Sequence, residues 1–365
     1  MTHKVYTYSS ATRDAASTTY RPARYNPTNF TWAYGPTFNA TAGVGLTQIP
    51  TFNTGTSWTP LISSQLDGEY TAGNVAAFGS LIAYYSRINN GNWSTASTWS
   101  NDIGRVSVSS TVPCATCPVI IGNGSGINHT VIADANNITC GSLQIVANST
   151  LDCGVRTGLN FGVNTNEVVS GNGILRINVS GGPVFPNGDF KDFIGSNGGT
   201  VVWYGTDATA FTLPASGPSV ALGAYYNLIV SPFTGQTITL PLTSLTIYNN
   251  LTTSGNGTTA TNVAAAHVYA VNGNLSVSSG TLQLSCNSAA TSTSFAINGN
   301  TTVASGASMV VQNANTGNHS LTTSGSFTNN GIVNFRQTAA RYLNLIFTGA
   351  SNTSLTGSNG AAPPP

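Results

Sequence analysis

The segments Asn272-Gly273-Asn274-Leu275, Asn298-Gly299-Asn300-Thr301 and Ser324-Gly325-Ser326-Phe327 decide the fold of this chain. They recur at a constant step of 26 residues, from position 275 to 301 and from 301 to 327. In each unit a turn of small residues leads to a second apolar pair, at Leu282, Met309 and Val333 and their neighbours. One such unit is too short to close a core, but stacked units bury one continuous apolar interior.

Apolar and polar residues alternate within these segments, which predicts strands rather than helices. Leu275 and Val277 would point to one face of a strand and Ser276 to the other. The same pattern continues upstream at residues 140–145, 173–177, 200–204, 227–230 and 245–247. We therefore predict an all-β fold, a parallel β-helix (β-solenoid), over residues 89–355. An antiparallel sandwich or barrel is the alternative, but it does not require a regular sequence repeat.

The N-terminal region, residues 1–88, is non-repetitive and rich in aromatic residues. We predict that it either caps the solenoid or forms an assembly region that packs against another subunit. The candidate contact residues are Tyr25, Phe30, Trp32, Tyr34, Phe52 and Trp58. At the other end, residues 356–365 finish on three prolines, which predicts a stiff linker or tail.

The composition is low in charge. Charged residues make up 6% of the 365 residues and the net charge is +1, whereas about a quarter is usual in globular proteins. Eleven Lys+Arg against ten Asp+Glu leave no basic surface for phosphates, which argues against nucleic acid as a partner. No apolar run approaches the roughly 20 residues of a membrane-spanning helix. A neutral surface of Asn, Thr, Ser and Gly favours an extracellular location.

Four cysteines lie near the start of the repeats: Cys114, Cys117, Cys140 and Cys153. Four thiolates could bind zinc, although their spacing is imperfect for such a site. In an exported protein, we expect the same cysteines to form two disulfides that join the first coils. Three pairings are possible, and the sequence leaves the choice open.

The carboxylates give little support for catalysis. Polysaccharide-cleaving β-solenoids place several carboxylates on one face of neighbouring coils. Here Asp189-Phe190-Lys191-Asp192 is the only dense charged group of the repeat region, and it is typical of a solvated turn. We therefore predict that the chain is not an enzyme and assign no catalytic residue, metal ligand or cofactor. A lyase or glycosidase on the same fold is the alternative function.

Residues 90–100 (NGNWSTASTWS) resemble the entry motif of repeat-rich surface proteins of Bacteroidota that are exported by type IX secretion. Residues 119–124, 140–145, 158–162 and 168–177 follow the order of segments in those proteins, and residues 185–201 are the most specific part. The resemblance covers about residues 84–345. The family's C-terminal sorting domain has no counterpart in this sequence, which predicts a processed chain or a fragment.

The resemblance implies export to the cell surface and a role in attachment or gliding motility. We thus expect an extracellular structural or adhesive module of a surface adhesin or fibre. Its expected partners are glycans, other cell surfaces or copies of itself in a homo-oligomer. Aromatic rings and side-chain amides suit sugar rings, and a low charge permits close packing of neutral surfaces.

Overall fold

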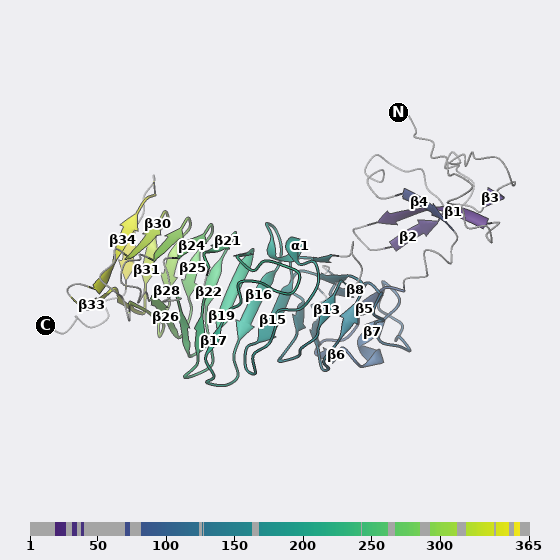
Figure 1. The fold of residues 1–365 in the computed structure, drawn as a ribbon, viewed down its shortest axis with the longest axis horizontal. Helices are drawn as coiled ribbons and strands as arrows, with labels where there is room; N and C mark the ends of the chain where they lie inside the picture. The colour runs from purple at the N-terminus through teal and green to yellow at the C-terminus, as the bar shows by residue number, and fades with distance from the viewer. Residues whose placement is uncertain are drawn as a thin grey trace, which may run out of the picture. The chain divides into compact units, whose positions relative to one another are not determined.

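The computed structural model is almost entirely β-sheet and contains a parallel β-solenoid, which confirms the predicted fold class (Figure 1). The chain divides into two compact units, Met1–Ala83 and Tyr84–Pro365. The structure describes residues 19–26, 31–34, 38–39, 70–73, 82–123, 126, 128–162, 168–241, 243–261, 267–284, 293–311, 319–338, 341–349 and 354–357.

The described strands of the first unit pair antiparallel, unlike those of the repeats. Its described strands are β1 (Thr19–Asn26), β2 (Thr31–Tyr34), β3 (Phe38–Asn39) and β4 (Tyr70–Gly73). β1 pairs with each of the other three.

The solenoid begins at Tyr84, earlier than the predicted residue 89. β5 (Tyr84–Ser86) pairs in parallel with β8 (Val119–Ile121) and antiparallel with β7 (Trp99–Ser100). The five-stranded sheet that they form continues through β11 (Leu143–Ile145) to β14 (Val169–Ser170). A two-stranded sheet joins β10 (Thr139–Cys140) to β13 (Asn160–Phe161).

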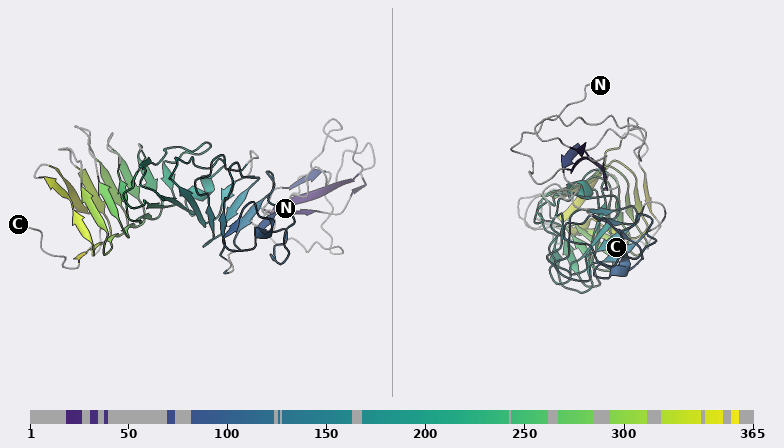
Figure 2. Two further views of the ribbon diagram at one scale, coloured as in Figure 1. Left: turned by 90° about the horizontal axis from the view of Figure 1, so that it is seen from below. Right: turned by 90° about the vertical axis from the view of Figure 1, so that its right-hand side faces the viewer.

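Three longer sheets form the faces of the solenoid, and Figure 2 shows their strands stacked side by side. The eleven-stranded sheet contains β6 (Gly91–Asn92), β9 (Thr130–Ile132), β12 (Thr150–Asp152), β15 (Ile174–Asn178), β16 (Thr200–Tyr204), β19 (Asn227–Ser231), β22 (Leu251–Thr253), β25 (Leu275–Val277), β28 (Thr301–Val303), β31 (Phe327–Asn329) and β35 (Leu355–Gly357). The six-stranded sheet contains β17 (Phe211–Thr212), β20 (Thr237–Thr239), β23 (Thr258–Ala260), β26 (Thr281–Leu284), β29 (Ser308–Val311) and β32 (Ile332–Asn334).

The seven-stranded sheet is the third face. It contains β18 (Ala224–Tyr225), β21 (Leu245–Ile247), β24 (Val268–Val271), β27 (Ser294–Ile297), β30 (His319–Thr323), β34 (Arg341–Phe347) and β33 (Arg336–Thr338). All its pairings are parallel except that of β33 with β34. Helix is scarce among the described residues: a 3-10 helix, η2 (Ala96–Thr98), and a single turn, α1 (Lys191–Ile194). No described helix has the length and hydropathy needed to cross a membrane.

The predicted alternation is confirmed in the core. One inward position of the eleven-stranded sheet is filled in successive coils by Leu228, Leu251, Leu275, Thr301 and Phe327. Each of these side chains is at most 1% exposed. The polar residues between the inward positions lie on the outer surface. Inside the seven-stranded sheet, the rings of Tyr269 and Phe295 stack with centroids 4.8 Å apart, close to the spacing of neighbouring strands.

The repeated Asn-Gly-Asn segments form the corner between the seven-stranded and eleven-stranded sheets. The side-chain Oδ1 of Asn250 accepts the backbone N–H of Asn274 at 2.9 Å, and Asn274 Oδ1 accepts that of Asn300 at 2.8 Å. Asn300 in turn accepts from Ser326 N at 2.9 Å. The amide ladder therefore satisfies backbone donors that the bend removes from the sheets.

Candidate binding surface

The coils from residue 208 to residue 335 carry no formal charge. No Asp, Glu, Lys or Arg occurs between Asp207 and Arg336. The two histidines in this stretch, His267 and His319, are each only 4% exposed. The outer surface of the described part of these coils therefore consists of hydroxyl, amide, aromatic and apolar groups, which favours an uncharged partner.

One outward position at the corner repeats along five successive coils, and we call this row the corner stripe. Each member follows the last paired inward residue of a strand in the seven-stranded sheet. Its members are Tyr226, Tyr248, Asn272, Asn298 and Ser324. The side chains of Tyr248, Asn272 and Asn298 are exposed, and those of Tyr226 and Ser324 are partly exposed. The stripe thus presents two phenol rings followed by two amides and a hydroxyl.

The amides of the corner stripe already form a ladder with one another. Asn298 Nδ2 donates to Asn272 Oδ1 at 3.3 Å. The second N–H of the Asn298 amide does not take part in this bond. The Nδ2 group of Asn272 does not take part in it either. Both residues are exposed, so these donors can reach a ligand at the surface.

The faces beside the corner stripe are lined by small side chains. On the seven-stranded sheet, the outward row in register is Ala224, Thr246, Ala270, Ala296 and Thr322. On the eleven-stranded sheet, it is Thr252, Ser276, Thr302 and Thr328. All of these are partly exposed. Next to Tyr226 the row of the eleven-stranded sheet continues in register as Ile229, a larger side chain that is partly exposed. From Tyr248 to Ser324 both neighbouring rows carry only small side chains, so a linear molecule can approach that part of the stripe from both sides.

A cluster of polar side chains lies on another part of the eleven-stranded sheet. Arg176 Nη1 lies 2.9 Å from Asp152 Oδ2, and the Tyr204 hydroxyl donates to Asp152 Oδ1 at 2.9 Å. The guanidinium of Arg176 lies over the Tyr204 ring at 4.3 Å. Burial and the neighbouring Asp152 carboxylate raise the pKa of Tyr204. The carboxylate is therefore held by two partners that tie together β12, β15 and β16.

Other described carboxylates are also bound locally. Asp134 accepts the backbone N–H of Ser94 at 2.9 Å and the hydroxyl of the same residue. Asp189 accepts from Lys191 N at 3.2 Å, as expected for the predicted solvated turn. Within the described ranges, no three His, Cys, Asp or Glu side chains are grouped to hold a metal ion.

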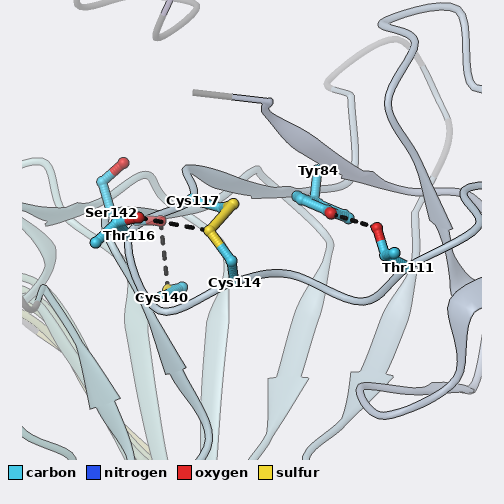
Figure 3. Close-up of a disulfide and its surroundings, with 7 residues drawn as sticks. All are labelled: Tyr84, Thr111, Cys114, Thr116, Cys117, Cys140 and Ser142. Atoms are coloured by element: carbon cyan, nitrogen blue, oxygen red, sulfur yellow. Dashed lines mark hydrogen bonds between the residues drawn. A yellow bond between two sulfur atoms is a disulfide. The ribbon is translucent and has the colours of Figure 1, made fainter. Parts of the chain in front are cut away.

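The four predicted disulfide cysteines fall into two kinds. Cys114 and Cys117 form a disulfide in the turn before β8, within one coil (Figure 3). Cys140 lies on β10, where its thiol donates to the carbonyl of Ser142 at 3.4 Å. Cys153 follows β12, and burial followed by the Asp152 charge raises the pKa of its thiol. The Cys114–Cys117 disulfide therefore does not join two coils. The raised pKa of the Cys153 thiol disfavours the thiolate form, which is the form that binds zinc.

The predicted contact aromatics lie in the first unit. Tyr25 is on β1 and Trp32 and Tyr34 are on β2, where Tyr25 pairs with Trp32. Phe30, Phe52 and Trp58 lie outside the described residues. Tyr226 and Tyr248 were not predicted as contact residues from the sequence. They align with Asn272 and Asn298 only when the coils are placed in register.

Comparison of the chain with protein-family models, curated protein sequences and solved structures found no match.

Proposed function

We propose that this chain is an extracellular structural and adhesive module without catalytic activity, whose solenoid attaches to neutral glycans along the corner stripe. The observation that carries the proposal is the uncharged surface of residues 208–335, on which Tyr248 is exposed and Tyr226 partly exposed in one row with Asn272 and Asn298. The resemblance of residues 90–100 to type IX-exported surface proteins supports an extracellular location.

The chemistry of the corner stripe matches that of an uncharged sugar polymer. Phenol rings offer flat apolar faces for sugar rings, and their hydroxyls remain able to form hydrogen bonds. The amides of Asn272 and Asn298 supply both donors and acceptors for sugar hydroxyls. An anionic polymer would find no cation in these coils, so its binding would lack the electrostatic attraction that basic sites provide.

Removal of the two rings tests this function. We expect Tyr226→Ala/Tyr248→Ala to weaken binding to at least one polymer among cellulose, chitin and amylose by tenfold or more, measured by pull-down and affinity electrophoresis. The matched control is Tyr342→Ala, since Tyr342 on β34 is 45% exposed and Tyr248 is 41% exposed. Binding should change little between low and high salt because no ion pair contributes.

Three results would count against the proposal. The proposal would be wrong if the native chain bound none of the three polymers. It would also be wrong if the double variant and the Tyr342→Ala control lost binding equally. Release of new reducing ends from a polymer would instead favour the lyase or glycosidase alternative.

A further inference from the structure

Four exposed asparagines lie together at the corner of two neighbouring coils, and we call them the amide array. Two of them flank Gly273 in one coil, and the other two flank Gly299 in the next coil. Its members are Asn272, Asn274, Asn298 and Asn300. The strands on both sides of this corner are paired in register between the two coils, so matching members lie about 4.8 Å apart, one strand spacing.

Hydrogen bonds to the protein occupy the acceptors of the amide array more than its donors. Asn272 Oδ1 accepts from Asn298 Nδ2 at 3.3 Å. Asn274 Oδ1 accepts the backbone N–H of Asn300 at 2.8 Å, and Asn300 Oδ1 accepts that of Ser326 at 2.9 Å. Among the described residues, the Nδ2 groups of Asn272, Asn274 and Asn300 donate to no protein group. The array therefore presents a surplus of N–H donors to the solvent.

A surplus of donors favours a partner that offers acceptors. A sugar hydroxyl carries both a donor and acceptor lone pairs, whereas the carbonyl oxygen of an amide is an acceptor only. A carboxylate is also an acceptor, but these coils contain no cation that would offset the cost of removing its charge from water. The neutral group that best complements the array is therefore an amide carbonyl. The N–H of the same amide can donate to Asn298 Oδ1, which accepts from no described residue.

Apolar groups lie next to the amide array. Ala270 and Ala296 face outward on the seven-stranded sheet, two residues before Asn272 and Asn298, and both are partly exposed. The exposed ring of Tyr248 holds the position of the corner stripe one coil before Asn272. Small alanines leave room for a methyl group, and a phenol ring offers it a flat apolar face. The corner thus combines amide donors with an apolar surface.

We propose that the amide array binds the acetamido group of an N-acetylated amino sugar, so that the corner stripe binds a chitin-like polymer in preference to cellulose or amylose. This inference rests on the proposed function and names the class of glycan. Asn272 and Asn274 donate to the acetamido carbonyl, Asn298 accepts its N–H, and the alanine row contacts its methyl group. A sugar with a hydroxyl in place of the acetamido group leaves these polar groups without matching partners, and it is bound more weakly.

Isothermal titration calorimetry of the full chain with soluble hexasaccharides tests the preference. The β-linked hexamers of N-acetylglucosamine and of glucose share one backbone and differ in the group on the second carbon of each sugar. We expect the native chain to bind the N-acetylglucosamine hexamer about tenfold more tightly than the glucose hexamer. The glucosamine hexamer, which carries an amine in place of the acetamido group, should bind no more tightly than the glucose hexamer.

A double variant tests the assignment to the amide array. Asn272→Asp/Asn274→Asp replaces two Nδ2 donors by acceptors and retains the Oδ1 atoms that hold the corner. This variant should lose the preference for the N-acetylglucosamine hexamer and bind the glucose hexamer nearly as the native chain does. The matched control is Asn256→Asp/Asn330→Asp, which adds the same charge at exposed asparagines between the eleven-stranded and six-stranded sheets and should keep the preference.

Equal affinity of the native chain for the N-acetylglucosamine and glucose hexamers would overturn the inference and leave the proposed glycan function intact. This comparison needs no variant, so it holds even if the double variant misfolds. Loss of the preference in both the array variant and its control would also overturn the assignment. If the native chain binds neither hexamer, the inference is wrong, and retention on the three polymers decides the proposed function separately.

Discussion

Individual threonines inside the core show where the repeat departs from an ideal apolar interior. Thr253, Thr259 and Thr301 are each at most 1% exposed, and none of their hydroxyls has a hydrogen-bond partner among the described residues. A buried hydroxyl without a partner costs free energy because it loses its hydrogen bonds to water. Thr301 stands between Leu275 and Phe327 in register, at a position where other coils place larger apolar side chains.

Thr301→Val should therefore stabilise the fold. Valine has nearly the same shape and removes the unpaired hydroxyl, so we expect the free energy of unfolding to rise by about 1–2 kcal/mol. Urea unfolding of both proteins measures the change. Thr302→Val, on the outward face of the same strand, should have little effect, and a destabilised Thr301→Val protein would contradict the assignment of an unpaired hydroxyl.

At the scale of the element, the corner explains why the Asn-Gly-Asn segment recurs. The amide ladder brings the corners of successive coils close together. A Cβ added at Gly299 would lie 2.5 Å from the carbonyl oxygen of Gly273 and 2.6 Å from Asn274 Oδ1. The same crowding occurs at Gly273 and Gly325. Glycine is thus required at this position by the approach of the neighbouring coil.

Gly299→Ala should destabilise the solenoid, since the added methyl group must push a backbone oxygen aside. We expect a loss of about 1–3 kcal/mol in the free energy of unfolding, the usual range for overpacking. Gly223→Ala is the control, because its nearest contact would be Ser244 O at 3.9 Å. Equal stabilities of the two variants would show that the corner can relax without cost.

On the scale of the whole molecule, few ionisable groups are available to make stability depend on pH near neutrality. His129 is 8% exposed, and its Nδ1 lies 2.9 Å from the hydroxyl of Ser86. Burial lowers the pKa of His129. The hydrogen bond with Ser86 raises this pKa, and the positive charge of Arg105 lowers it further. Burial also lowers the pKa of His267. Folding therefore disfavours the protonated form of both rings.

The unfolded chain would protonate these histidines near their usual pKa of about 6.5. Unfolding then takes up protons below that pH, so the free energy of unfolding should change little between about pH 7 and 8 and fall as the pH drops from about 6.5 toward 5. Urea unfolding across this range measures the slope. His129→Gln should reduce the slope and leave the part due to His267, whereas a native chain that gains stability on acidification would contradict this account.

Much of the solenoid could be predicted because its rules are local. Alternation of Leu275, Ser276 and Val277 sets the faces of a strand, and the 26-residue step sets the repeat. The step between inward residues nevertheless varies in the structure: it is 20 residues between Val131 and Leu151, 23 between Leu228 and Leu251 and 28 between Phe327 and Leu355. Loops between the faces absorb the difference, so a constant period locates only the middle coils.

The pairing of the cysteines could not be predicted from local sequence patterns. The sequence predicted two disulfides joining the first coils, but Cys114 and Cys117 close a turn within one coil. Cys140 lies on β10 in the two-stranded sheet. Cys153 directly follows β12, which belongs to the eleven-stranded sheet. Sequence spacing alone does not specify the direction of a side chain around a corner, and that direction decides which sulfur atoms can meet.

The sequence by itself determined the class of fold, the inward and outward positions and the neutral surface, because these follow from alternation, repetition and composition. Only the tertiary structure decided that Tyr226, Tyr248, Asn272 and Asn298 form one row, because that row depends on the register between coils. It also decided that Leu355 is exposed. A residue of the repeating core is buried only if another coil stacks on it, and this is a property of the assembled layers rather than of the residue.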